Sequence, residues 1–142
     1  KFLNSLYNGT YKNGGLKMEQ GIVVKNTAQL EHSTVGDLCS LAEVLHPKNE
    51  KLPFCGFSLS HAEILPHGCT IPHRMMKSSE VYWVIEGSGT LFINGTPVAL
   101  KKGIAVMVPP SAEQYAVNDS DKILEFLCIV SPPWDKSDEE II

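Results

Sequence analysis

The chain has 142 residues, of which 43% are hydrophobic, and its 12 Lys and Arg residues against 16 Asp and Glu residues leave a formal net charge of −4. This length suits one domain with one core, and no apolar run approaches the roughly 20 residues of a membrane-spanning helix. The basic residues are scattered along the chain. We therefore expect neither nucleic acid nor a membrane as a partner.

The two ends of the chain differ in composition and residue pattern from the rest. Residues 1–17 are polar, rich in Asn and Gly, and lack the continuous apolar segment of a signal peptide. We expect them to form an N-terminal arm or extension, the domain to run from 18 to 134, and residues 135–142 to be a solvated acidic tail. The four cysteines lack the paired spacing of zinc or redox motifs, so a cytoplasmic location is expected.

From residue 20 onward, short apolar or alternating runs separated by turn residues predict an all-β sandwich or barrel. Helix signals are nearly absent. The most secure hairpin lies at Asn94-Gly95, a pair that readily takes the positive φ angles of a tight turn. The predicted strands are 22–24, 40–45, 54–64, 69–74, 81–86, 90–93, 97–100, 104–108, 114–117 and 122–130.

Residues suited to chemistry gather in two stretches. The first reads GCTIPHRMMKSSEVYWVIEG and ends at Gly87. Side chains alternate along a strand, so His73 and Met75 project from one face, and Glu80 returns on the next strand. All three side chains can therefore point into one cavity.

The second stretch, GIAVMVPPSAEQYAVN, follows later in the chain. Its Pro109-Pro110 turn leads into a strand that presents Gln114 and then Asn118. Gln114 offers both a hydrogen-bond donor and an acceptor, so it suits a bound ion and a polar ligand equally well.

Together the two stretches resemble the signature motifs of the cupin superfamily, and the resemblance covers about residue 20 to residue 134. The first motif of that family runs from a Gly through His-x-His and Glu to a second Gly, and the second has Pro-x-Gly, then His, then Asn. The matching positions here are His73, Met75, Glu80 and Gly87, followed by Pro109, Ser111, Gln114 and Asn118. The resemblance implies an antiparallel jelly-roll barrel, the double-stranded β-helix.

The resemblance also implies a metal site formed by His73, Glu80, Gln114 and Met75. In the family, imidazoles and a carboxylate hold Mn, Fe, Ni, Cu or Zn. Here Met75 and Gln114 replace two imidazoles. An amide oxygen is a weak ligand, and a thioether suits only a soft ion such as Cu(I), so we expect a divalent metal to bind weakly.

Glu80 and Tyr82 are the candidate catalytic residues. A carboxylate among apolar neighbours needs a cation or a hydrogen-bond donor, and without a metal Glu80 becomes a candidate general acid or base. Tyr82 shares a strand face with Glu80 and is expected to line the pocket. His61 and Glu63 share a strand face with Phe57 and Leu59, and we therefore expect His61 and Glu63 to point inside.

Two functions are compatible with these residues. The first is an isomerase, lyase or dioxygenase in which a divalent metal polarises a small polar metabolite. The second is a metal-free module that binds or senses a small molecule without catalysis, which the loss of two imidazoles favours. The apolar strands and Trp134 lead us to expect a homodimer.

Overall fold

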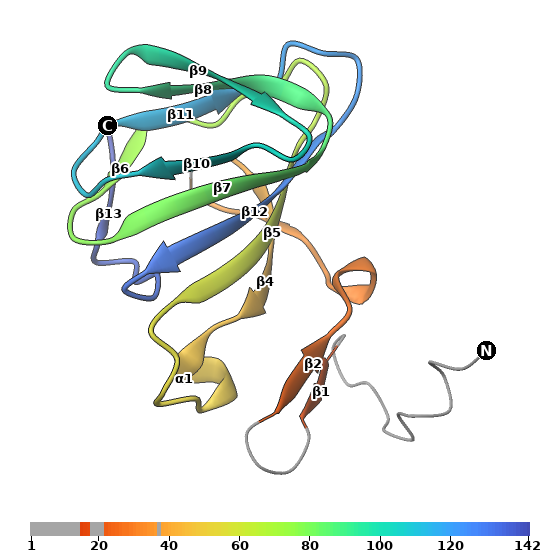
Figure 1. Cartoon of the computed structure of the whole chain (residues 1–142), viewed down its shortest axis with the longest axis vertical. Coiled ribbons are helices and arrows are strands. Elements are labelled where there is room, and N and C mark those ends of the chain that lie inside the picture. The colour runs from red at the N-terminus through yellow and green to blue at the C-terminus, as the bar shows by residue number, and fades with distance from the viewer. Residues whose placement is uncertain (1–14, 18–21, 37) are drawn as a thin grey trace.

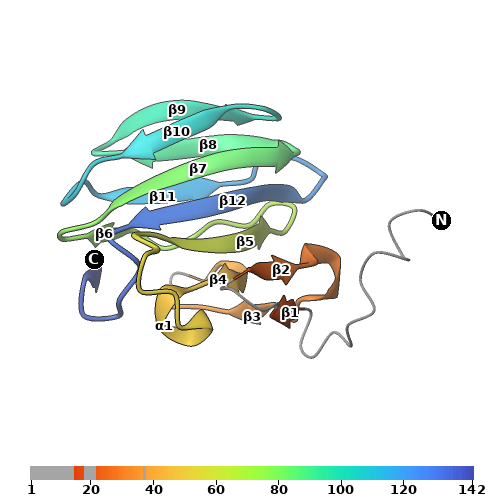
Figure 2. The same cartoon turned by 60° about the horizontal axis from the view of Figure 1, so that its bottom comes forward.

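The computed structural model describes residues 15–17, 22–36 and 38–142. Two antiparallel sheets face each other (Figures 1 and 2). One sheet has six strands in the order β10-β7-β12-β5-β4-β3, and the other has five in the order β13-β6-β11-β8-β9. The predicted all-β jelly-roll barrel is confirmed. No helix among the described residues is long and apolar enough to span a membrane.

The elements have the following bounds. The strands are β1 (Gly15–Lys17), β2 (Val23–Lys25), β3 (Ser33–Thr34), β4 (Ser40–Leu45), β5 (Ser58–Ile64), β6 (His73–Met75), β7 (Ser79–Glu86), β8 (Ser88–Ile93), β9 (Thr96–Lys101), β10 (Ala105–Val108), β11 (Gln114–Val117), β12 (Leu124–Ser131) and β13 (Glu139–Ile141). A 3₁₀ helix occupies Thr27–Gln29, and the short helix α1 occupies Pro47–Glu50. Most of the predicted N-terminal arm lies outside the described residues, apart from β1, which pairs with β2.

Alternation along the strands places the core between the two sheets. On β7, Tyr82 and Val84 are buried, whereas Trp83 is 51% exposed. On the opposite sheet, Leu91 of β8 and Leu100 of β9 are fully buried and belong to the same apolar cluster. One face of each sheet thus forms the core, as expected for antiparallel sheets with one covered face.

The predicted hairpin and two of the predicted strands agree closely with the structure. Asn94 and Gly95 both have positive φ and connect β8 to β9, and β4 and β11 have their predicted bounds. The predicted strand 54–64 starts later, at Ser58, because residues before it form turns around α1. The helix α1 is absent from the predicted elements, although Pro47 at a first helical position is a typical start signal.

The prediction of a solvated tail at 135–142 is wrong. β13 pairs with β6 and completes the edge of the five-stranded sheet. Asp138 is buried, and its carboxylate accepts hydrogen bonds of 2.8 and 3.0 Å from the backbone amides of Lys77 and Ser78. The segment is ordered because this carboxylate and the β13 ladder satisfy backbone groups at the end of β6.

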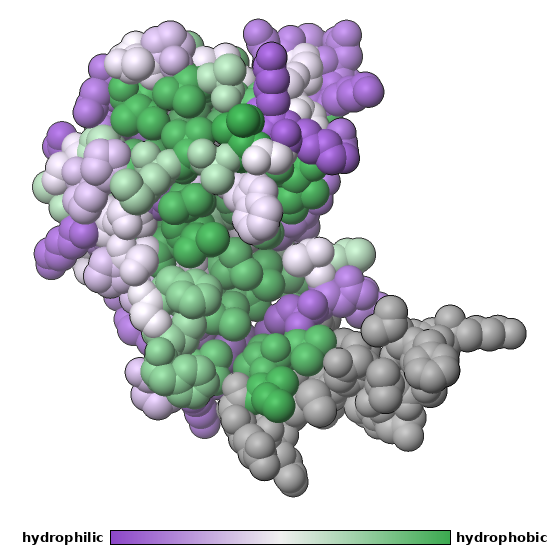
Figure 3. All heavy atoms as spheres, in the orientation of Figure 1, coloured by the Kyte–Doolittle hydropathy of each residue, from purple (hydrophilic) through white to green (hydrophobic). Residues whose placement is uncertain are grey.

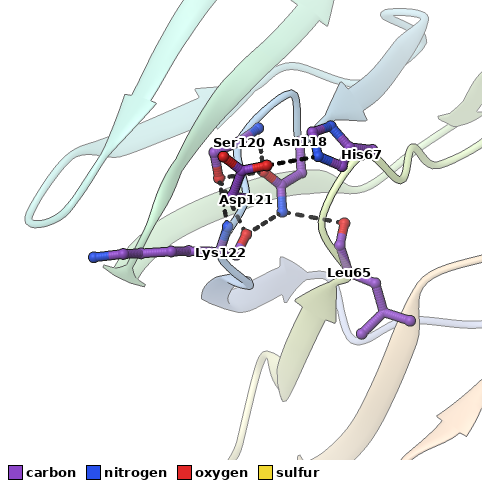
Figure 4. A network of polar contacts seen from close by, with 6 residues as sticks. All are labelled: Leu65, His67, Asn118, Ser120, Asp121 and Lys122. Carbon is purple, nitrogen blue, oxygen red and sulfur yellow. Dashed lines mark hydrogen bonds and ion pairs between the residues drawn. The ribbon is translucent and has the colours of Figure 1, made fainter.

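Two of the motif residues hold the barrel together. Asn118 is fully buried, and its Nδ2 donates to the carbonyls of Ile64, Leu65 and Lys122, tying the turn after β5 to the turn before β12 (Figure 4). Gly87 has φ +85°, and a Cβ there would overlap the carbonyl oxygen of Ile123. These positions shape loops, because only an amide and a residue without a side chain meet the local demands.

Candidate functional site

A cavity of about 450 Å³ opens between the two sheets. Inward side chains of β4, β5, β6, β7 and β12 form most of its wall, and the C-terminal segment 134–139 contributes to it as well. The wall is mainly apolar, with a few polar groups. This combination of size and lining is typical of a small-molecule site.

The structure brings His73, Glu80 and Gln114 together from three different strands. Gln114 on β11 stands opposite His73 on β6 in the antiparallel register. The Nε2 of Gln114 donates a 2.7 Å hydrogen bond to Oε2 of Glu80 on β7. All three residues are buried, with exposed fractions of 3%, 8% and 1% in chain order. His73 and Glu80 line the cavity, whereas Gln114 stands behind Glu80.

The orientation of the His73 ring follows from one hydrogen bond. Its Nδ1 lies 3.0 Å from the carbonyl oxygen of Ile71. A carbonyl can only accept, so Nδ1 carries a proton, and Nε2 is the nitrogen through which the neutral ring can exchange a proton or bind a ligand.

Two further predicted residues, Met75 and Tyr82, also line the cavity. Both are 3% exposed. Tyr82 lies on the same face of β7 as Glu80, and its ring centroid is 5.3 Å from that of Phe126. Met75 follows His73 on the same face of β6. Both side chains therefore shape the wall beside the polar pair.

The donor set at this position fits a divalent ion only in part. His73 and Glu80 are suitable ligands, but Gln114 presents its N–H group to the carboxylate, and a thioether is a poor ligand for hard and borderline ions. Within the described part of the chain, the cavity holds no cluster of three His, Cys, Asp or Glu ligands. The residues do not fit the tight site of a three-imidazole cupin.

One buried atom at the site has no partner. The Oε1 of Gln114 is enclosed and accepts no hydrogen bond from any described residue. A buried acceptor without a donor costs about 1–3 kcal/mol. The position of Gln114 therefore provides the hydrogen bond to Glu80 but lowers the stability of the folded protein, because Oε1 is left without a donor.

The prediction that His61 and Glu63 point inside is wrong. Ala62 and Ile64 of β5 belong to the core, so the alternate residues His61 and Glu63 face the outer side of the sheet. His61 is nevertheless buried, since His32 covers it and donates or accepts a 2.8 Å hydrogen bond. Parity along the strand grouped these residues correctly, but it did not indicate which face was covered by the core.

The C-terminal segment contributes cavity residues that the sequence did not place at the site. Trp134, Lys136 and Glu139 line the cavity. The backbone N–H of Trp134 donates a 2.9 Å hydrogen bond to Ser58 Oγ, and its carbonyl accepts one of 2.9 Å from His46 Nε2. Residues 131–142 show no strand periodicity, so no pattern placed them at the site.

Comparisons with known proteins agree with this architecture. The family model described as "Cupin domain" matches residues 60–130, half of the chain. An uncharacterised protein of Methanocaldococcus jannaschii is 33% identical over 104 residues, which cover 72% of this chain and 80% of that protein.

Solved structures with a similar fold share little sequence with this chain. A predicted oxalate decarboxylase of Thermotoga maritima superposes with a TM-score of 0.68 at 16% identity, over 77% of this chain and 98% of that protein. Pac13 of Streptomyces, a nucleoside dehydratase, gives a TM-score of 0.62 at 16% identity over 79% and 85%. Such identities show the fold alone, but the family match and the archaeal relative show the family. The chain belongs to the cupin family.

Proposed function

We propose that the barrel cavity binds a small polar metabolite through Glu80 and His73 and needs no tightly held metal to do so. The observation that carries this proposal is the buried 2.7 Å hydrogen bond from Gln114 to Glu80. Gln114 stands at the position at which the family motif has a metal-binding His. Its amide gives the Glu80 carboxylate a neutral hydrogen-bond donor instead of a cation.

The chemistry of the two cavity residues suits a ligand with hydroxyl or amine groups. An ionised carboxylate has about four acceptor sites, so Glu80 can accept from a ligand in addition to its bond from Gln114. His73 faces the same space, and its Nε2 is the atom through which it would donate or accept. The apolar wall around them would bury the rest of a small ligand and strengthen these polar contacts.

Glu80 and His73 also supply the groups needed for proton transfer. Glu80 would take a proton at a carboxylate oxygen, and His73 would exchange one at Nε2, with the Tyr82 hydroxyl as a third polar group on the wall. The similar fold of a nucleoside dehydratase and of a predicted oxalate decarboxylase supports a reaction on a small polar substrate. We assign the reaction to the lyase or isomerase class, which proton transfer alone can catalyse.

A second candidate is a weak divalent metal site, favoured by the partnerless Oε1 of Gln114. Rotating the Gln114 amide by half a turn would bring this oxygen toward the Glu80 carboxylate. A cation bound between the two oxygens would stabilise that arrangement. His73, Glu80 and Gln114 would then be the ligands, with Met75 alongside.

A thermal-shift screen separates the two candidates. Purified protein is tested against a metabolite library with and without EDTA, and bound metal is measured by plasma mass spectrometry after reloading with Mn, Fe, Ni, Cu or Zn. A metabolite shift that grows with the logarithm of ligand excess, survives EDTA and disappears in Glu80→Gln supports the first candidate. Glu63→Gln, the same chemical change on the outer face, should leave it intact. Loss of the shift in EDTA would favour the metal site.

We further propose that the protein is a homodimer formed through the outer face of β10, β7 and β12 in the six-stranded sheet. Two cross-strand rows of apolar residues run over β10, β7 and β12, and a band of hydrophobic atoms is visible there (Figure 3). One row consists of Ala105, Trp83 and Leu127, and the other of Met107, Val81 and Ile129. Trp83 and Met107 are 51% and 66% exposed. Because these rows carry no charge, a second copy of the same face can meet them without repulsion, and contiguous apolar patches of this kind mark protein interfaces.

A further inference from the structure

A second group of residues suited to metal binding lies on the outer side of β5, away from the cavity. The ligand atoms of His32, His61 and Glu63 all lie within 4.8 Å of one another. His32 Nε2 is 2.8 Å from His61 Nδ1, and His61 Nε2 is 2.6 Å from Oε1 of Glu125 on β12. His61 is buried, while His32 and Glu63 are half-buried, so solvent ions can reach the group.

The hydrogen bonds fix which nitrogen of His61 is available. The Glu125 carboxylate accepts from Nε2, so Nε2 carries a proton and Nδ1 of the neutral ring holds a lone pair directed at His32. A histidine whose second nitrogen donates to a carboxylate is the usual arrangement of a metal ligand, because the carboxylate orients the ring and raises its basicity. Glu125 is placed to act as this positioning residue.

The two carboxylates at this group, those of Glu63 and Glu125, also favour the binding of a cation. Glu63 stands directly opposite Glu125 in the β5–β12 register, and like charges in that relation destabilise a sheet. Glu125 is engaged with His61. Within the described part of the chain, the carboxylate of Glu63 has no hydrogen-bond or ion-pair partner.

We propose that this group binds a divalent transition metal of the zinc class through His32 Nε2, His61 Nδ1 and the carboxylate of Glu63. Two imidazoles and one carboxylate are a ligand set used by zinc and by non-haem iron. Metal–nitrogen bonds of about 2.0–2.1 Å require the two imidazole nitrogens to move apart by a few tenths of an ångström, to about 3.3 Å in a tetrahedral site. The proton on His32 Nε2 moves to Nδ1 of that ring, and a water fills the fourth position.

The site is independent of the barrel cavity. Ser60 of β5 lines the cavity, whereas His61 and Glu63 do not. His73 and Glu80 therefore take no part in it, and the site stands whether or not the proposed barrel function is correct.

Zinc titration of the full chain tests the proposal. Isothermal titration calorimetry with Zn²⁺ should show one site in the wild type, weakened at least tenfold in His32→Gln and in Glu63→Gln. His67→Gln is the matched control, since His67 is an exposed histidine paired with Asp121 at 2.9 Å, and it should bind as the wild type does. His73→Gln should also leave the affinity unchanged.

The role of Glu125 needs a spectroscopic readout. Glu125→Gln should lower zinc affinity by about 10–100-fold while Co²⁺ at saturating concentration keeps its visible absorption spectrum, because the three ligands remain. Absence of any Zn²⁺ binding, equal affinity in Glu63→Gln and wild type, or loss of binding in His73→Gln would each overturn the proposal.

Discussion

Gln114 and Glu80, which lie on opposite sheets, are joined by a buried hydrogen bond of 2.7 Å from amide nitrogen to carboxylate oxygen. The bond crosses the interior of the barrel and fixes the carboxylate beside His73. A neutral donor at this position stabilises an ionised Glu80 without adding a charge to the cavity. Gln114, at the position that the motif resemblance assigns to a metal-binding His, thus supplies a polar contact to Glu80 that differs from an imidazole in what it can bind.

Gln114→Glu tests this contact by placing a second carboxylate against Glu80. The two groups cannot both ionise at that distance, so the pair must share a proton. We expect the free energy of unfolding to fall by about 1–3 kcal/mol at pH 8 and to recover toward pH 5, where the shared proton restores a donor. Urea denaturation at the two pH values measures the change. Gln114→Met, which removes the donor without a charge, should lose stability equally at both, and a Gln114→Glu variant with no pH dependence would contradict this role of the amide.

Gln114→His restores the ligand found at this position in the family motif. With His73 and Glu80 the new imidazole would form a set of three strong donors, so metal occupancy of the barrel should rise severalfold over the wild type. The measurement is plasma mass spectrometry after reloading with Mn or Zn, made in a Glu63→Gln background so that the proposed outer site does not contribute. Equal occupancy with and without the Gln114→His change would show that geometry, and not ligand identity, limits metal binding.

Asn118 offers a prediction about stability. Its Nδ2 faces three backbone carbonyls, so Asn118→Asp replaces a donor with an oxygen that repels them. Leaving buried polar groups unpaired beside a buried charge costs about 3–5 kcal/mol, and the urea midpoint should fall accordingly. Ser120→Ala, which removes a neighbour of the same network at a more exposed position, should cost less than about 1 kcal/mol. Similar losses in both variants would contradict the role of the Asn118 side chain.

The sequence predicted the convergence at the cavity because two simple rules govern it. Strand alternation puts His73 beside Met75, and the antiparallel return puts Glu80 within reach. The Asn94-Gly95 hairpin fixes the register of β8 and β9, and β8 in turn pairs with the strand that carries Gln114. Strand alternation and the hairpin register, which both depend on neighbouring residues in the sequence, therefore determine which of these side chains come together.

The cover of His61 by His32 and the pairing of β13 with β6 could not be predicted in the same way. Both depend on contacts made by segments whose sequences show no strand or helix periodicity. His61 and Glu63 were grouped correctly, but the residue that covers them, His32, comes from an irregular stretch before β3. β13 has no alternation of its own and forms because the edge of β6 offers unpaired backbone groups. No rule based on nearby residues predicts either contact.

The attachment of the C-terminal segment should weaken in acid. Asp135 accepts hydrogen bonds from Lys48 Nζ, 2.8 Å, and from the backbone and hydroxyl of Ser137, 3.0 and 2.7 Å, which hold the pKa of its carboxyl well below the ordinary value. A lowered folded-state pKa contributes stability above the unfolded pKa, and this contribution is lost as the pH falls below about 4. The contacts are exposed, so the effect is small and weakens in salt.

Lys48→Met removes the first of these contacts. The melting temperature of the variant should approach that of the wild type as the pH is lowered from 7 to 2, because protonation of Asp135 removes from the wild type the ion pair that the variant already lacks. Circular dichroism melts at low and high salt provide the curves. Lys51→Met, a change at a neighbouring exposed lysine, should run parallel to the wild type. A constant difference between Lys48→Met and wild type at every pH would mean that the ion pair does not cause it.

Trp83→Arg tests the proposed homodimer. Trp83 sits between Ala105 of β10 and Leu127 of β12 in one cross-strand row, and its side chain points away from the core. Arg at this position would place one charge from each copy at the centre of an apolar contact, and burying such unpaired charges costs several kcal/mol. We expect light scattering to give twice the chain mass for the wild type and the single mass for Trp83→Arg. Lys102→Met, outside the apolar rows, is the control and should remain dimeric. A wild type that stays monomeric at high concentration would show that this face serves another contact.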